Sequence, residues 1–470
     1  MNQVNLPSSE VGNSEALLDL LRKNQQHHII DHWFKLPGDK KIEFFEETKK
    51  LNLSLVFDLY RKAQTQHRPI SFSQIKPAQI ISLPNSPEER AEREEARRLG
   101  EQLLQSQQVA VLIVSGGQGS RLGFHGPKGK FPISPIKKKS LFQIFAETLR
   151  ALQIRYRATI PFLIMTNPEN HRETRQFFEM NQYWGLSPEN VFFFDQGMLP
   201  TLTLEGDLIL RDETHLFTNP DGHGGSLKAL FESGLLQMLM ERKYSDLFYF
   251  QVDNPLVKIA DPVFLGFHRK AKAEISTKVV RRTHSEEKVG IYLEIDGRPG
   301  IIEYSDFPPG EYQARDEKGQ IRYWAGNTAI HVFSLSFIHR LNLHGFALPY
   351  HRAIKAIEIK DSAGRTIQTN GIKFESFVFD AIPLAERSCC LEVLREEEFS
   401  PVKNREGIDS PATAQAALLQ LHRRWLREAG IDLGPEARVE ISPLLALDPE
   451  ELRQKLKGRS RTIQGDLYLG

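Results

Sequence analysis

Three features are scarce or absent in this 470-residue sequence, and each absence excludes a class of protein. Cysteine occurs only as the adjacent pair Cys389 and Cys390, which gives neither a disulfide framework nor the spacing of a metal site. The expected location is therefore a reducing cytoplasm. Charge of one sign is not in excess, because 61 Lys and Arg stand against 60 Asp and Glu, so a diffuse basic surface for nucleic acid is not expected. No apolar run approaches the length of a membrane span, and the polar N-terminal stretch has no signal-peptide core, so no membrane association is expected.

The length of the chain predicts two or three domains, since one compact core rarely grows to this size. We expect a mostly helical N-terminal region over residues 1–107, a main domain over 108–385 and a small C-terminal domain over 386–470. In the main domain, predicted strands at 161–166, 191–194 and 247–252 alternate with predicted helices at 140–154, 171–180 and 226–240. This alternation predicts an α/β fold with a mixed, mostly parallel sheet flanked by helices, and ligands bind beyond the carboxyl ends of such strands.

A glycine-rich loop follows the first core strand of the main domain. The apolar run Val109–Val114 predicts a buried parallel strand that stops at Ser115, and Gly116, Gly117 and Gly119 follow. Glycines let a ligand approach the backbone and allow positive φ where a turn needs it. Because Arg121, Lys128 and Lys130 follow on the same loop, the pattern predicts an anion site, most commonly for the phosphates of a nucleotide.

Two common phosphate loops do not fit this stretch. The dinucleotide pattern G-x-G-x-x-G, started at Gly117, needs glycine where Leu122 stands. A Walker A loop ending at Gly129 and Lys130 needs glycine at Phe124 and a hydroxyl residue at Phe131.

A third pattern does fit. The loop GGQGSRLG with PKGK is similar to the signature loop of nucleotide-sugar pyrophosphorylases, and further blocks follow in family order over roughly residues 108–419. These blocks are QGMLP, PDGHGG, QVDNPLVKIADP, EYS, AGNTAIHVF, KFESFVFD and LREEEFSPVKN. Together they make the chain resemble the UDP-N-acetylhexosamine (UDP-N-acetylglucosamine) pyrophosphorylase family, within the uridylyltransferase group.

The resemblance implies a Rossmann-like, GT-A-like nucleotidyltransferase fold, with residues 108–385 as the catalytic nucleotide-sugar pyrophosphorylase domain. It implies that UTP and a sugar 1-phosphate give a UDP-sugar and pyrophosphate, by in-line attack on the α-phosphorus. Such a site has to align two polyanions and neutralise charge on the leaving group, and it needs no covalent nucleophile. Lysine, arginine, backbone amides and a divalent ion suit this task.

The residues expected to carry this chemistry fall into three sets. Arg121 and Lys128 are expected to meet the UTP phosphates beside the amides of Gly117 and Gly119, and Lys403 in SPVKN matches a family lysine that reaches the phosphates. Asp253, at the end of a predicted strand, is the expected ligand of Mg²⁺, with Mn²⁺ as the alternative ion. Gln196 is expected to read uracil, because its amide offers both a donor and an acceptor. The remaining matches are Gly116 and Gly222 at the base and ribose, and Gly290, Glu303, Tyr304, Asn327 and His223 at the sugar.

Departures from the family pattern leave the sugar open. The hexosamine family usually has asparagine at the position of His223. Histidine at this position resembles UDP-glucose and broad-specificity UDP-sugar pyrophosphorylases. N-acetylglucosamine 1-phosphate is favoured, and glucose 1-phosphate or mixed acceptance remains open. A GT-A-like glycosyltransferase and a non-catalytic UDP-sugar sensor are two further hypotheses, although retention of Lys128, Asp253 and Lys403 together argues against a sensor.

Overall fold

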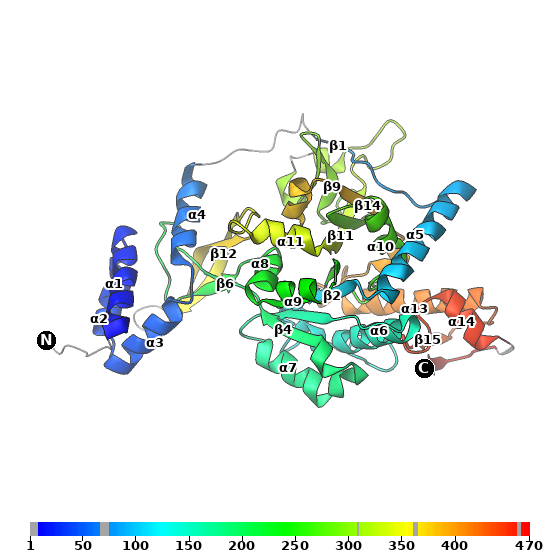
Figure 1. Ribbon diagram of the computed structural model, residues 1–470, viewed down its shortest axis with the longest axis horizontal. Coiled ribbons are helices and arrows are strands. Elements are labelled where there is room, and N and C mark those ends of the chain that lie inside the picture. Colours follow the sequence, from blue (N-terminus) through cyan, green and yellow to red (C-terminus); the bar gives the residue numbers. More distant parts are fainter. Residues whose placement is uncertain (1–7, 66–74, 308–309, 361–364, 458–461) are drawn as a thin grey trace. The chain divides into compact units, whose positions relative to one another are not determined.

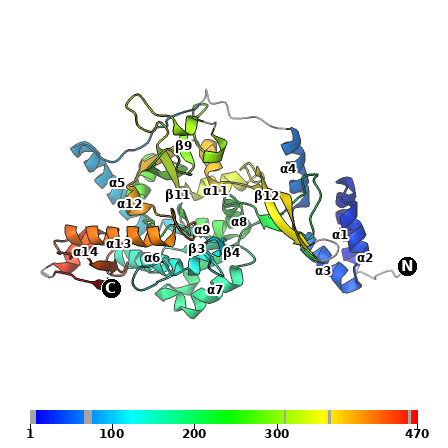
Figure 2. The same cartoon turned by 180° about the vertical axis from the view of Figure 1, so that it is seen from behind.

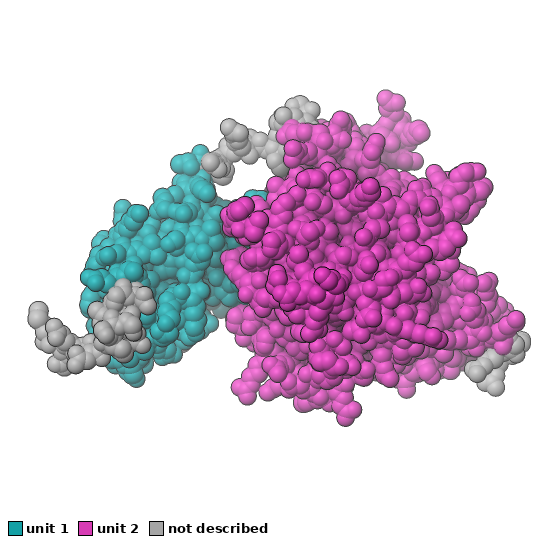
Figure 3. Space-filling view, in the orientation of Figure 1, with its two compact units in different colours: residues 1–70, 196–226, 348–378 teal, residues 71–195, 227–347, 379–470 magenta. Residues whose placement is uncertain are grey.

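The computed structural model describes residues 8–65, 75–307, 310–360, 365–457 and 462–470, and within these ranges the chain divides into two units. The smaller unit, here unit 1, comprises residues 1–70, 196–226 and 348–378, and unit 2 comprises the remainder (Figure 3). The predicted divisions after residues 107 and 385 follow the chain in order, whereas unit 1 is built from three separate stretches. Those divisions stay predictions.

Unit 1 combines N-terminal helices with two antiparallel ribbons. Its helices are α1 (Ser8–Lys23), α2 (His27–Lys35), α3 (Gly38–Thr48) and α4 (Leu53–Thr65), and its strand pairs are β5 (Met198–Pro200) with β6 (Thr218–Pro220) and β12 (His351–Lys360) with β13 (Thr366–Glu375). Its core buries Ile29, Phe44 and Val56 of the helices together with Leu202 and Ile372. The helical N-terminal stretch therefore packs on segments that follow it by more than 130 residues.

Unit 2 is built on a mixed sheet, seen near the centre of Figure 1. The order β1-β9-β11-β7-β2-β3-β4 forms its main path among the described residues, with β8, β10 and β14 branching from it. Strands β7, β2, β3 and β4 are mutually parallel, β14 is parallel to β8, and β11 is antiparallel to β7 and β8. The strands are β1 (Ile75–Lys76), β2 (Val109–Val114), β3 (Phe162–Thr166), β4 (Val191–Asp195), β7 (Asp246–Gln251), β8 (Ile275–Arg281), β9 (Ile291–Ile295), β10 (Arg298–Ile302), β11 (Ala325–Ser334) and β14 (Ser388–Glu392).

The helices of unit 2 flank this sheet, and the predicted fold class is confirmed. They are α5 (Pro87–Gln105), α6 (Leu141–Tyr156), α7 (His171–Met180), α8 (Gly225–Glu232, which starts at the end of a unit 1 stretch), α9 (Leu235–Glu241), α10 (Pro262–Lys270) and α11 (Leu335–Asn342). Ser86 begins α5 with a capping box to Glu89 and with Pro87 in the first turn, and Ser140 caps α6. The single helix predicted over 226–240 is wrong, because Gly234 with φ of +75° ends α8 and separates it from α9.

The C-terminal part of unit 2 consists of α12 (Arg395–Glu398), α13 (Pro411–Glu428), β15 (Arg438–Ile441), α14 (Pro449–Leu456) and β16 (Asp466–Leu469). Ser410 caps α13 through a capping box with Thr413, as expected for the sequence Ser-Pro at a helix start. Helix α13 packs on β15 and α14, and Figure 2 shows these elements together from behind. No helix in the described ranges is both long and apolar enough to span a bilayer. Cys389 and Cys390 on β14 are buried and unbridged.

Candidate functional site

The glycine-rich loop begins where β2 ends, and two asparagines after β3 hold its first two carbonyl groups. Asn167 Nδ2 donates to Gly116 O at 2.6 Å, and Asn170 Nδ2 donates to Ser115 O at 3.1 Å. Both asparagines are buried and also bond each other's backbone. Carbonyl oxygens that would repel a phosphate are thereby engaged by amides. Sequence analysis missed both residues, although the run TNPEN at the end of a predicted strand was a usable signal.

The glycines of this loop have different tasks. At Gly117, no atom lies within 4 Å of the place where a Cβ would stand, so the backbone there is open. Gly119 has φ of −79° and donates its N–H to Gly126 O at 2.9 Å, and a Cβ on it would lie 2.8 Å from the ring of Phe124. The Gly119 amide is thus bonded within the loop, and its place beside a phosphate stays a prediction. The positive φ values of the loop fall at Gly123 and Gly126.

The cationic side chains of the loop also differ in their partners. Lys128, in the short 3₁₀ turn η3 (Lys128–Lys130), donates from Nζ to Val402 O at 3.2 Å. Lys130 Nζ lies 2.5 Å from Glu173 Oε1 on α7, so its charge is paired. Arg121, in the turn η2 (Ser120–Leu122), is exposed and has no ion pair within the described ranges. Lys128 thus contacts the segment that carries Lys403.

Asp253 and Lys403 are brought near each other by backbone pairing. The Val402 N–H donates to Asp253 O at 2.8 Å, and Lys403 Nζ lies 4.0 Å from Asp409 Oδ2. Burial raises the pKa of Asp409, Lys403 opposes that rise, and the carboxylate of Asp253 adds to it. Three predicted phosphate-site residues, Lys128, Asp253 and Lys403, therefore meet around Val402.

A further residue, Asn254, stabilises the contact between the Asp253 turn and the Lys403 segment. Its buried side chain donates from Nδ2 to Glu398 O at 2.6 Å and accepts at Oδ1 from the Ser400 N–H at 3.1 Å. The turn that carries Asp253 is thereby tied to the segment that leads to Lys403. Nothing in the sequence pattern separates such an asparagine from an ordinary turn residue, so sequence analysis missed it.

The residues present fit a divalent ion held partly by substrate. Asp253 is half-buried at the carboxyl end of β7, where a carboxylate can face a ligand. Among the described residues no group of three or more His, Cys, Asp or Glu is placed to bind a metal. A hard ion at Asp253 would accordingly take most of its ligands from phosphate oxygens and water, which is how Mg²⁺ is commonly held.

In unit 1, the residue predicted to read uracil contacts a glycine predicted to lie at the base and ribose. Gln196, which is buried, donates from Nε2 to Gly222 O at 2.8 Å. Gly222 has φ of +89°, and a Cβ there would lie 2.3 Å from Ser376 O, so only glycine fits. The Gly222 carbonyl thus fixes the Gln196 side chain. A larger residue at position 222 would displace that carbonyl.

His223 follows Gly222 and is held by a hydrogen bond and a ring stack. Its Nδ1 accepts from the Val378 N–H at 3.2 Å. The imidazole stacks on Phe377 with 5.4 Å between ring centroids and 28° between planes. The residue that departs from the family pattern is therefore a fixed part of unit 1.

In unit 2, three of the four remaining predicted sugar residues lie together. Asn327 N–H donates to Gly290 O at 2.8 Å, and a Cβ on Gly290 would lie 3.0 Å from Glu303 Oε1. A bulge in β11 between Asn327 and His331 changes the direction of the strand beside this group. Tyr304 is 41% exposed, and Lys288 Nζ lies 5.9 Å from its ring.

The predicted residues thus fall into three groups, and their roles stay predictions. Unit 2 holds the phosphate group, with the loop, Lys128, Asp253 and Lys403, and it holds the group of Gly290, Glu303 and Asn327. Unit 1 holds Gln196, Gly222 and His223.

Similarity to known proteins extends over most of the chain. It is 39% identical over 376 residues to the UDP-N-acetylglucosamine pyrophosphorylase of Saccharomyces cerevisiae, covering 77% of this chain and 78% of the relative. It is 34% identical to UDP-N-acetylglucosamine diphosphorylase 2 of Arabidopsis thaliana, covering 95% and 92%. The crystal structure of the UDP-N-acetylglucosamine pyrophosphorylase from Trypanosoma brucei matches with a TM-score of 0.81 at 25% identity, over 97% of this chain and 98% of that one.

A family model described as UTP–glucose-1-phosphate uridylyltransferase matches residues 54–463. This range contains the glycine loop, Asp253 and Lys403, and it includes every other residue assigned above. The resemblance inferred from the sequence blocks is confirmed. The chain belongs to the UTP–glucose-1-phosphate uridylyltransferase family.

Proposed function

We propose that this protein is a UTP:sugar-1-phosphate uridylyltransferase that makes UDP-N-acetylglucosamine and pyrophosphate from UTP and N-acetylglucosamine 1-phosphate. One observation carries the proposal: Lys128 of the glycine loop, the turn of Asp253 and the segment of Lys403 converge on the backbone of Val402. Cations and a carboxylate gathered beside an open glycine backbone suit a triphosphate with its ion. We also propose that the protein is cytoplasmic.

The proposed reaction is a single displacement. A phosphate oxygen of the sugar 1-phosphate bonds to the α-phosphorus of UTP, while the bond from that phosphorus to the bridging oxygen breaks and pyrophosphate leaves with the electron pair. Lys128 and Lys403 would neutralise charge on the phosphates, and Arg121 would approach from the exposed side of the loop. Positioning and charge stabilisation account for most of catalysis in reactions of this type.

Mg²⁺ is the proposed cofactor, and Mn²⁺ is the alternative. Asp253 would hold the ion, which would supply positive charge to the phosphates when bound. Gln196 would bind the base and keep its amide fixed through the Gly222 carbonyl. Gly116 and Gly222 would let main chain approach the nucleoside.

N-acetylglucosamine 1-phosphate is the proposed sugar substrate, because the yeast and plant relatives carry that sugar in their names. Gly290, Glu303, Tyr304 and Asn327 would contact its hydroxyl and acetamido groups. A second candidate, acceptance of glucose 1-phosphate, is favoured by His223 and by the description of the matching family model.

The test replaces Lys128 by alanine and measures UTP-dependent pyrophosphate release. We expect a loss of about 10²- to 10³-fold in kcat/KM, the size found when one charge-stabilising group is removed from an active site. Lys138→Ala is the matched control, because Lys138 is exposed on the segment after the loop, and it should keep near-normal turnover. Near-normal turnover by folded Lys128→Ala would contradict the assignment.

Substrate range is measured with a panel of sugar 1-phosphates. N-acetylglucosamine, N-acetylgalactosamine and glucose 1-phosphates are each supplied with UTP, and ATP, GTP and dTTP serve as controls. Sugar transfer from a UDP-sugar without pyrophosphate chemistry would instead indicate a glycosyltransferase. Binding of UDP-sugar with no exchange of labelled pyrophosphate would indicate a sensor.

A further inference from the structure

Unit 2 contains a cavity of about 440 Å³ that includes none of the residues proposed to bind substrate. Its wall is formed by parts of α5, α6 and α13, by residues 255–263 and by residues 440–450. Cavities of 300 to 1,000 Å³ are, by general experience, of roughly the size that holds a small organic molecule. The proposed reaction assigns no role to this cavity.

The interior of the cavity is largely apolar. Leu152, Val257, Leu421, Trp425 and Leu447 are among the side chains that line it. Apolar surface of this kind favours a ligand with a hydrocarbon or aromatic body, since that body is removed from water on binding. The indole of Trp425 also offers a face that attracts cations.

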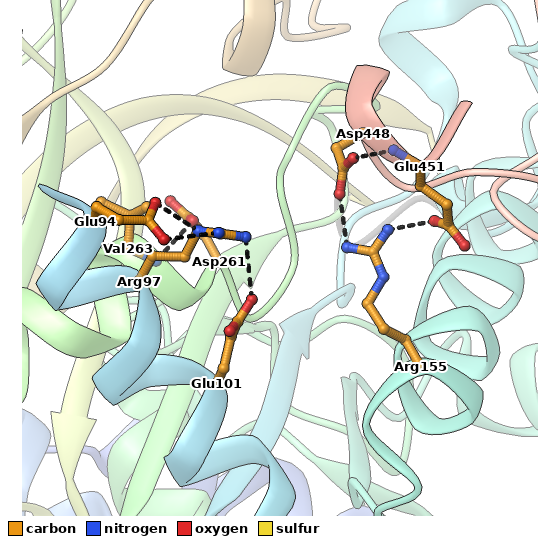
Figure 4. A network of polar contacts seen from close by, with 8 residues as sticks. All are labelled: Glu94, Arg97, Glu101, Arg155, Asp261, Val263, Asp448 and Glu451. Carbon is orange, nitrogen blue, oxygen red and sulfur yellow. Dashed lines mark hydrogen bonds and ion pairs between the residues drawn. The ribbon is translucent and has the colours of Figure 1, made fainter. Parts of the chain in front are cut away.

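The positive charges around the cavity are already neutralised. Figure 4 shows Arg97 between Glu94 and Glu101, and Arg155 between Asp448 and Glu451. Arg155 Nη1 lies 2.7 Å from Asp448 Oδ2, and the neighbouring carboxylates raise the pKa of both arginines.

The two lysines of the wall are also paired. Lys258 Nζ lies 2.7 Å from Glu397 Oε2, and Lys139 Nζ lies 2.5 Å from Glu147 Oε2. Each basic side chain of the wall therefore has a carboxylate partner, and an anionic ligand would have to displace one.

Negative charge is in excess at the wall. The lining carboxylates are Glu94, Glu101, Asp261, Glu397, Glu440, Asp448 and Glu450, whereas the lining basic side chains are Arg97, Lys139, Arg155 and Lys258. Glu450 is exposed and forms no salt bridge within the described ranges, and its charge acts at longer range on Arg97, whose pKa it helps to raise. Burial lowers the pKa of His422 to about 4, so this wall residue adds no positive charge at neutral pH.

We propose that this cavity binds a small organic cation with an apolar body. Its hydrocarbon part would pack between Trp425 and the aliphatic side chains, and its charged end would lie toward Glu450 at the cavity rim. The wall segment 255–261 follows Asp253 closely in the chain, so the ligand would contact the back of the turn that carries the proposed metal ligand. Binding itself does not depend on the proposed function.

The test compares three probes with one carbon skeleton: 4-phenylbutylammonium, 4-phenylbutan-1-ol and 4-phenylbutyrate. Isothermal titration of the full chain at pH 7.5 and low salt should give about tenfold or more tighter binding of the ammonium than of the carboxylate, with the alcohol between them. Equal or tighter binding of the carboxylate would overturn the proposal. So would the absence of measurable binding by all three probes up to about 10 mM, which is weaker than any useful site.

Two variants locate the binding. Thr148→Trp places a large side chain into the cavity from α6 and should abolish binding, whereas Ile154→Trp, on the same helix but 66% exposed, should bind normally. Glu450→Gln should reduce the ammonium-to-carboxylate preference several-fold, and Glu436→Gln, exposed and outside the wall, should leave it unchanged. Because Glu450 is exposed, that variant decides the question even if Thr148→Trp fails to fold. The proposal would be refuted if Glu450→Gln kept the parent protein's full preference for the ammonium over the carboxylate. Undiminished binding in folded Thr148→Trp would also refute it.

Discussion

At the scale of single residues, the glycine loop contains positions that look alike in the sequence and differ in the structure. Gly117 has free space where a side chain would begin, while a Cβ on Gly129 would lie 2.2 Å from the ring of Phe142. The first glycine is therefore dispensable for packing, and the second is required by it. The open space at Gly117 leaves that backbone accessible to a ligand.

Alanine substitution separates these two tasks. Gly117→Ala should change the free energy of unfolding by less than about 1 kcal/mol, because its φ is not positive and no atom is displaced. It should nevertheless raise the KM for UTP about tenfold, because a methyl group then stands where the phosphates approach. Gly129→Ala should destabilise the fold by about 1 to 3 kcal/mol through overpacking. Urea unfolding and initial-rate kinetics measure the two effects, and an unchanged KM in Gly117→Ala would contradict a phosphate site at this backbone.

Asn254 makes a second prediction at this scale. Asn254→Asp keeps an acceptor for the Ser400 N–H but turns an oxygen toward Glu398 O, where the amide now donates. We expect a loss of about 1 to 3 kcal/mol in stability, the cost of leaving a buried polar group without its partner. Because Asn254 positions both Asp253 and Lys403, the KM for Mg²⁺ and for UTP should rise more than kcat falls.

The control for this prediction is Asn404→Asp. Asn404 lies on the same segment, is exposed and donates to Ile408 O at 2.9 Å, so its loss should have a smaller effect on stability and on the KM for Mg²⁺. A drop in kcat alone for Asn254→Asp, with both KM values unchanged, would contradict a positioning role.

At the scale of elements, the helix–strand contact between α13 and β15 contains a buried titratable group. His422 accepts from the Ile441 N–H, and burial lowers its pKa from an ordinary value of 6.5 to about 4. In the unfolded chain the imidazole binds a proton near pH 6.5, but in the folded protein it does so only near pH 4. Between these values the unfolded state binds more protons, so stability falls as pH falls, by up to about 3 kcal/mol.

The His422→Asn variant tests this pH dependence, because asparagine does not titrate and still offers an acceptor. Its unfolding free energy should be lower at pH 7.5 and should fall less steeply than that of the parent protein between about pH 6.5 and 4.5, because the other titrating groups are common to both. His344→Asn, at an exposed position, should keep the parent slope. Urea titrations at three pH values measure these slopes, and an equal slope in His422→Asn and the parent protein would contradict the assignment.

The same scale shows what the sequence could and could not predict. The strands Val109–Val114 and Phe162–Thr166 were predictable, because unbroken apolar runs bounded by turn residues have few other solutions. The break at Gly234 was not, since the pattern does not reveal which glycine adopts positive φ. The ribbon of β12 and β13 was missed, although HRAIKAIEIK alternates apolar and charged residues over part of its length.

Within the candidate site, the sequence blocks pointed to some residues that the structure brings into contact, while their roles stay predictions. Gln196 and Gly222 were both assigned to the nucleoside from separate blocks, and a hydrogen bond joins them. The sequence did not reveal hydrogen bonds between loop residues, such as the one that the Gly119 amide donates to the Gly126 carbonyl. The asparagines that hold the loop and the Asp253 turn act through backbone groups far away in the chain, so local patterns could not identify them.

At the scale of the whole molecule, the architecture of unit 1 gives residues 8–65 a structural task. Their helices bury apolar side chains against Leu199, Leu202 and Leu208 and against Ile372 and Phe374, so three stretches that are distant in sequence share one core. Unit 2 has core clusters of its own. Units with separate cores commonly unfold in separate steps, so the changes in unfolding free energy predicted above for residues of unit 2 belong to the unfolding step of that unit.

Hydrogen exchange of a variant with a charge in the unit 1 core tests this arrangement. Val56 on α4 is fully buried, so Val56→Asp should destabilise unit 1 by about 3 to 5 kcal/mol, the cost of an unpaired buried charge. Peptides from residues 15–65, 199–216 and 366–375 should lose protection together, because one core holds all three, while peptides from β2 and β7 keep theirs. Ser54→Asp, exposed on the same helix, should leave every peptide unchanged. Loss of protection confined to residues 15–65 would mean that the helices fold apart from the ribbons, and unit 1 would then not be one cooperative body.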